Sequence, residues 1–264
     1  MSVMRLRALA ALLTAALALT ACSGGSGDAG TSASSGRSGV TGEVTVFAAA
    51  SLTESFTRIG RDFEAAYPGT KVTFNFGGSS ALAAQITQGA PADLFAAASP
   101  ATVKTVTDAG LTDGEAVTLV RNELVIVVAK GNPKGITGLA GLTQPGLKVA
   151  LCAEQVPCGA AAKKALDAAS VKVTPVTLEQ DVKAALQKVK LGEVDAALVY
   201  RTDAQAAAAD VAAVEFPESA KAVNDYPIAV LKDAPHKAAA QKLLAWIRSD
   251  KGMAVLTQAG FQTP

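Results

Sequence analysis

The chain has 264 residues, of which 50% are hydrophobic and 5% aromatic, and its formal net charge is +1. This amount of apolar material can bury a sizeable core without disulfide or metal support. The balanced charge, with no basic stripe and few aromatic side chains, argues against nucleic acid as a partner. An anion site in such a chain must depend on local dipoles and not on an excess of positive charge.

Residues 1–21 have the pattern of a secretory signal peptide. Arg5 and Arg7 form a basic start, and residues 8–19 are apolar with a single polar interruption. A basic start, a short apolar stretch and small residues at the end are typical of a cleaved signal, and this stretch is too short to span a membrane as a mature helix. We therefore expect export across the cytoplasmic membrane.

The predicted signal ends directly before a cysteine. The ending Leu19-Thr20-Ala21-Cys22 resembles the lipobox of bacterial lipoproteins, which implies that Cys22 becomes the acylated first residue of the mature protein. An uncleaved anchor or a chance cysteine is the alternative. Residues 22–42 are mostly Ser, Gly, Ala, Thr and Asp, a composition that cannot bury a core and predicts a flexible tether. This order of segments predicts an extracytoplasmic protein held at the cell membrane by its N-terminal lipid.

Strand and helix patterns alternate along the rest of the chain. Strands are expected at residues 44–48, 71–76, 93–97, 124–129, 148–151, 172–175, 196–200 and 228–231. Helices are expected at residues 51–67, 80–88, 102–109, 159–169 and 180–191, in the alanine-rich stretch 204–213, and from Pro235 onward. Alternation of this kind predicts an α/β fold whose sheets are covered by helices.

Four of the expected strand-to-helix turns share a composition. Each brings a small, hydroxyl or N-capping residue to a helix start, at residues 48–53, 76–82, 156–159 and 179–182. Unpaired N–H groups and a partial positive charge at helix N-termini suit an anion. Taken singly, each turn is an ordinary helix cap, and Gly77-Gly78 lacks the lysine and spacing of a nucleotide-binding loop. Their joint presence predicts an anion site.

Cys152 and Cys158 remain as an even pair once Cys22 is lipidated. Because the two lie close in sequence and the expected compartment is oxidising, a disulfide is the expected state. The only histidine, His236, lies far from them, so we expect no metal site and no cofactor. The sequence has no Ser/His/Asp arrangement and no Ser-x-x-Lys in the turns described above, so we do not expect an enzyme.

Three segments resemble the periplasmic molybdate-binding proteins of ABC transporters. They are Val44 to Leu52 (VTVFAAASL), Gly78 to Leu82 (GSSAL) and Gly89 to Phe95 (GAPADLF). Further matches follow in order, and the likeness runs from about Glu43 to Phe261. It implies that a monomer captures molybdate, and tungstate with it, for delivery to an ABC transporter permease.

The same resemblance implies the residues that bind the oxyanion. Ser51 and Ser79 would give hydroxyl and N–H donors, Cys158 and Val182 backbone N–H donors, and Tyr200 its phenol. The family commonly has a small residue where this chain has Cys158. Molybdenum would be held as its oxyanion, with no direct metal ligand. Because the set offers donors only, it suits a fully ionised oxyanion better than hydrogen phosphate. Sulfate stays open as the alternative ligand.

The resemblance also implies a type II periplasmic-binding-protein-like fold, in which two α/β lobes are joined by a two-strand hinge and close on the ligand. We expect the first lobe at residues 43–121 plus 225–264 and the second at residues 122–224. The predicted site residues are then divided between the lobes, so that the ligand bridges them.

Overall fold

The computed structural model describes residues 41–264, which lie in one compact unit. The predicted signal peptide and Cys22 lie outside the described residues, as does nearly all of the predicted tether. Within residues 41–264, no helix combines the length and hydrophobicity needed to cross a membrane.

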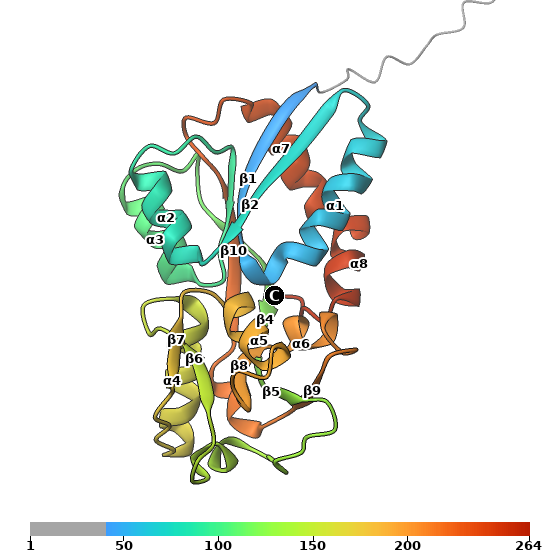
Figure 1. Ribbon diagram of the computed structural model, residues 1–264. Helices are drawn as coiled ribbons and strands as arrows, with labels where there is room; N and C mark the ends of the chain where they lie inside the picture. Colours follow the sequence, from blue (N-terminus) through green and yellow to red (C-terminus); the bar gives the residue numbers. More distant parts are fainter. Residues whose placement is uncertain (1–40) are drawn as a thin grey trace, which may run out of the picture. The chain divides into compact units, whose positions relative to one another are not determined.

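Two mixed five-stranded sheets organise the described part of the chain (Figure 1). The strands of the first sheet are β1 (Gly42–Ala49), β2 (Thr70–Gly77), β3 (Leu94–Ala96), β4 (Val117–Asn122) and β10 (Asn224–Val230). Those of the second are β5 (Leu124–Ala129), β6 (Val149–Cys152), β7 (Thr177–Glu179), β8 (Ala196–Tyr200) and β9 (Val211–Val214). The first sheet has the order β2-β1-β3-β10-β4 and the second the order β7-β6-β8-β5-β9.

Helices cover both sheets. Those around the first sheet are η1 (Ala50–Leu52), α1 (Thr53–Ala66), α2 (Ser79–Thr87), α3 (Pro100–Asp108), α7 (Lys237–Ile247) and α8 (Asp250–Gln258). Those around the second are η2 (Leu139–Thr143), α4 (Pro157–Ala169), α5 (Val182–Lys190), α6 (Arg201–Ala206) and η3 (Pro217–Lys221). Figure 1 shows α2 and α3 on one side of the first sheet and α1, α7 and α8 on the other. The expected α/β fold with helix-covered sheets is confirmed.

The burial of strand residues explains why the sequence pattern predicted most of the strands. Residues 124–128 of β5 are all buried, as their continuous apolar run predicted. The strand predicted at residues 172–175 is wrong, because Pro175 cannot donate to a ladder and pairing begins only at Thr177. The alanine-rich stretch 204–213 is helical only at its start, since β9 pairs with β5 and overrides the helical propensity of alanine.

The chain crosses between the two sheets twice. Glu123 alone separates β4 from β5, and the return runs from β9 through η3 into β10. At this junction Asn122 and Asn224 are paired across β4 and β10. The division into lobes after residues 121 and 224 stays a prediction.

Candidate functional site

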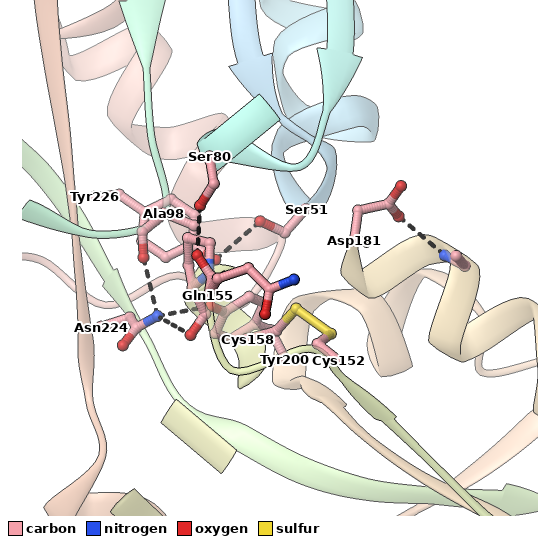
Figure 2. The surroundings of a disulfide bond; sticks show 12 residues. Ser51, Ser80, Ala98, Cys152, Gln155, Cys158, Asp181, Tyr200, Asn224 and Tyr226 are labelled. Carbon is pink, nitrogen blue, oxygen red and sulfur yellow. Dashed lines mark hydrogen bonds between the residues drawn. A yellow bond between two sulfur atoms is a disulfide. The ribbon is translucent and has the colours of Figure 1, made fainter. Parts of the chain in front are cut away.

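The structure brings the five predicted site residues to one small cavity between the two sheets. Ser51, Ser79, Cys158 and Val182 lie at the starts of the η1–α1 segment, α2, α4 and α5, and Tyr200 ends β8. Figure 2 shows Ser51, Cys158 and Tyr200 converging there. The other lining residues are Ala49, Ala50, Gly77, Gly78, Ala98, Val156, Pro157 and Asp181. That these residues bind a ligand stays a prediction.

The cavity has room for a small ion only. The space open to the centre of a water molecule is about 20 Å³. With the radius of the water added, this corresponds to a hollow of about 3 Å in radius. A central atom surrounded by four oxygens has this size, whereas a sugar or an amino acid does not fit. The cavity therefore suits a compact polyatomic ion.

Local sequence leaves backbone N–H groups free at the helix starts. Pro157 is the first residue of α4 and has no N–H, so the amide of Cys158 is the first donor of that helix. Asp181 caps α5 by accepting from the amide of Ala184 at 2.9 Å, which leaves the earlier amide of Val182 unused by the cap. At each start the first N–H groups have no partner within the helix.

Hydroxyl groups supply further donors, and each is held by a neighbour. Ser51 Oγ lies 2.8 Å from the hydroxyl of Tyr226. Ser79 Oγ accepts from the amide of Ala98 at 3.0 Å. All three cavity hydroxyls, those of Ser51, Ser79 and Tyr200, belong to buried residues. They keep fixed positions because the surrounding core leaves them no room to move.

The electrostatics of the cavity come from dipoles. Among residues 41–264, no lysine, arginine or histidine lines it. The one charged side chain in this lining, Asp181, is engaged at the start of α5. Burial raises the pKa of the Tyr200 phenol well above its ordinary value, and the nearby Asp203 charge raises it further, while hydrogen bonds with Asn224 and Tyr226 oppose this. Tyr200 is therefore a neutral donor at physiological pH.

Contacts between elements of the two sheets close the cleft around the cavity. Ser80 Oγ of α2 donates to the carbonyl oxygen of Gln155 at 2.7 Å (Figure 2). Gly78 packs so tightly on Gln180 that an added Cβ would overlap the Gln180 carbonyl oxygen. This close approach explains why the position before Ser79 is glycine. The structure is a closed form.

An ion triad that the sequence analysis missed lies beside the cavity. Lys183 Nζ is 2.7 Å from Glu54 Oε1 and 3.1 Å from Asp203 Oδ1. Asp203 is fully buried, and burial raises the pKa of its carboxyl to about 6 despite the opposing charge of Lys183. Glu54 follows Ser51 by three residues and Lys183 follows Val182 directly, but no sequence signal links positions 129 residues apart.

Cys152 and Cys158 form the predicted disulfide, which is confirmed. It joins the end of β6 to the first turn of α4, the turn that presents the Cys158 amide (Figure 2). Across residues 41–264 no group of three or more His, Cys, Asp or Glu residues is arranged to hold a metal ion.

Comparisons with known proteins show the family of this chain. The family model described as bacterial extracellular solute-binding protein matches residues 44–262. The molybdate-binding protein ModA of Mycobacterium tuberculosis (strain H37Rv) is 47% identical over 221 residues, which cover 84% of this chain and 85% of that protein. The resemblance found in the sequence motifs is thereby confirmed.

Two solved structures share the fold. The periplasmic molybdate-binding protein of Azotobacter vinelandii matches with a TM-score of 0.71 at 21% identity, over 84% of this chain and 99% of that one. The sulfate-binding protein SubI of M. tuberculosis H37Rv matches with a TM-score of 0.71 at 20% identity, over 84% and 86% of the two chains. Likeness at such identity shows the fold alone. From the family match and the 47% identity together, the chain belongs to the bacterial extracellular solute-binding proteins.

Proposed function

We propose that this protein captures molybdate outside the cytoplasmic membrane and delivers it to an ABC transporter permease. The observation that carries the proposal is the ion-sized cavity, lined by the four helix starts and Tyr200 and, within the described part of the chain, free of cationic side chains. The proposal is also supported by a relative 47% identical to this chain, which is named a molybdate-binding protein.

The cavity offers hydrogen-bond donors to all four oxygens of a tetrahedral dianion. The donors are the hydroxyls of Ser51, Ser79 and Tyr200 and the amides of Ser51, Ser79, Cys158 and Val182. A hydrogen bond to a charged group contributes roughly 1.5–3 kcal/mol. After the costs of immobilising the ion and closing the cleft, such a set supports a dissociation constant below about 1 μM.

The donor set also selects among oxyanions. Hydrogen phosphate carries a proton that needs an acceptor, and the proposed site offers donors. Sulfate has the right charge, but the relative that shares 47% identity is named for molybdate, and the likeness to a sulfate-binding structure extends only to the fold. Sulfate is therefore not favoured. Tungstate matches molybdate in charge and shape, so we expect it to bind as well.

Ligand binding and cleft closure are coupled in this proposal. The ion touches donors from elements of both sheets, so it binds the closed form more tightly than an open one and shifts the population toward it. The permease would recognise the closed arrangement. Acylation of Cys22 would keep the protein, as a monomer, close to that permease.

Calorimetry on residues 23–264 tests the proposal, since residues 41–264 lie in one compact unit. The titrants are molybdate, tungstate, sulfate and phosphate. We expect tight binding of the first two and weak or no binding of the others. Tight binding of sulfate would move the protein to sulfate uptake, and no binding of any of the four would overturn the oxyanion assignment.

A further inference from the structure

Asn224, at the start of β10, lies between the two sheets with three oxygen atoms around its side-chain nitrogen. Nδ2 is 2.6 Å from the Tyr200 hydroxyl, 2.9 Å from the Ala98 carbonyl oxygen and 3.4 Å from the Pro157 carbonyl oxygen. The residue is 7% exposed. Figure 2 shows its amide nitrogen as the meeting point of these contacts. A single side chain thus connects the cavity tyrosine to backbone around both sheets.

The direction of the bond between Asn224 and Tyr200 follows from these neighbours. Carbonyl oxygens only accept, so the group that faces Ala98 and Pro157 must be the NH₂ of the amide and not its oxygen. Because the same NH₂ faces the phenol, Asn224 donates and Tyr200 accepts. The reverse arrangement would place the amide oxygen against two carbonyl oxygens.

The direction of that bond decides where the phenol proton goes. A phenol has one proton to donate, and its oxygen also accepts. Asn224 donates to the phenol oxygen. The Tyr226 hydroxyl also hydrogen-bonds this phenol and lowers its pKa, as a second donor does. The phenol proton is therefore left for a partner in the cavity that Tyr200 lines. The phenol is also kept neutral, because burial raises its pKa.

We propose that Asn224 is a positioning residue that holds the Tyr200 hydroxyl as a donor toward the ligand, and that this makes the site prefer a fully ionised oxyanion over a protonated one. The inference rests on the proposed function, because it assumes an oxyanion in the cavity. Asn224 would thus help to determine selectivity without contacting the ligand itself.

A double-mutant cycle tests whether Asn224 acts through Tyr200. We expect Asn224→Ala to weaken molybdate binding by about 10-fold when Tyr200 is present and by less than about 2-fold in the Tyr200→Phe background. A purely structural role of Asn224, through Ala98 and Pro157, would weaken binding equally in both backgrounds. Equal losses, or no loss in either background, would overturn the proposal.

Asn122 provides the matched control. It is buried and pairs with Asn224 across the same strands. Its side chain donates to Thr202 Oγ1 at 2.9 Å and to the Tyr226 hydroxyl at 3.5 Å, and not to Tyr200. Asn122→Ala is expected to change molybdate affinity by the same factor with Tyr200 or with phenylalanine at position 200. Coupling to Tyr200 as strong as that of Asn224 would contradict the assigned specificity of the contact.

Asn224→Asp tests the selectivity with a side chain of the same size. The introduced carboxylate has no N–H for the phenol or for the carbonyl oxygens of Ala98 and Pro157. The phenol therefore donates its proton to the carboxylate and turns an oxygen lone pair toward the cavity. At about pH 8 molybdate and hydrogen phosphate both carry about two negative charges, so charge repulsion cancels in their affinity ratio. We expect the preference for molybdate over phosphate to fall by at least about 10-fold. An unchanged ratio would overturn the proposal.

Failure of the proposed function is distinguishable from failure of this inference. If the wild-type protein binds sulfate and not molybdate, the proposed function fails, and the same cycle is measured with sulfate. Coupling between Asn224 and Tyr200 would then still support the positioning role, and its absence would overturn it. A wild-type protein that binds no oxyanion overturns both.

Discussion

Asp203 is the most unusual single residue beside the site, because its carboxyl group is fully buried while its cationic partner, Lys183 at 3.1 Å, is partly exposed. The charged or titratable groups around it are Lys183, Glu54 and the phenol of Tyr200. Burial raises the pKa of the Asp203 carboxyl from 3.8 to about 6. The folded protein therefore binds more protons at this group than the unfolded chain does between these two values.

The stabilisation linked to this proton is complete below about pH 4 and is lost as the pH rises through about 6. We predict that the free energy of unfolding of the wild type, relative to Asp203→Asn, falls by about 2–3 kcal/mol between about pH 4 and pH 7. Urea unfolding at a series of pH values measures it. Asp167→Asn, which removes an exposed carboxylate of α4, is the control. A difference that stays constant or grows with pH would show that the group titrates normally.

Ser51 and Ser79 each place a side-chain hydroxyl and a backbone amide at the cavity. Replacing either by alanine removes a donor to a charged oxygen and spares the backbone, so we predict that molybdate affinity falls by about 10–100-fold. Ser55→Ala is the control, because Ser55 is buried in α1 but does not line the cavity. Calorimetry measures the affinity of all three variants for molybdate. Equal affinities for Ser51→Ala and Ser55→Ala would show that the Ser51 hydroxyl does not bind the ligand.

At the scale of elements, local patterns at strand ends and helix starts explain which parts of the site could be predicted from the sequence. The turns carrying Ser51 and Ser79 were predictable because a buried strand, small residues and an amphipathic helix follow each other within a few positions. Asn224 and the Lys183–Asp203 contact were not, because their partners are brought together only by the pairing of β10 and the packing of α5 on α6. Short β7 and β9 were missed or misplaced because register with a neighbour, and not local pattern, defines them.

The disulfide between Cys152 and Cys158 joins two elements, β6 and α4. We predict that a Cys152→Ser, Cys158→Ser double variant loses about 2 kcal/mol of stability, as expected for a short closed loop. Because the proposed contact from position 158 is its amide, molybdate affinity should fall by less than about 10-fold. Thermal unfolding and calorimetry measure the two effects. An affinity loss as large as that of Ser51→Ala would mean that the cross-link shapes the site.

For the whole molecule, Gly78 provides a steric test of closure. An added Cβ would overlap the Gln180 carbonyl oxygen, whereas at Gly77 it would meet only the side chain of Leu82 at 3.6 Å. We predict that Gly78→Ala leaves the fold intact but obstructs closure, lowering molybdate affinity by at least about 10-fold, while Gly77→Ala has little effect. X-ray scattering with and without molybdate should show compaction for Gly77→Ala only. Compaction of both variants would refute the closed cleft as the binding form.

The location of the molecule depends on residues before the described part. We predict that Cys22→Ser abolishes acylation and releases the protein from the membrane fraction, because a signal without its lipid leaves no anchor. Mass spectrometry of the mature N-terminus and membrane fractionation measure the two consequences. Retention of the Cys22→Ser protein in membranes, with an intact signal segment, would indicate an uncleaved anchor instead.

The cation-free cavity has a consequence for the conditions in which the protein can work. Dissolved salt weakens attraction between charges that face water, over a screening length of about 8–10 Å. In the proposed function the attraction would come from amides and hydroxyls at helix starts, which belong to buried residues lining the cavity. The affinity should therefore change little as external ionic strength varies. In the proposed function, the protein would hold its ion about equally well in dilute and in saline surroundings outside the cell.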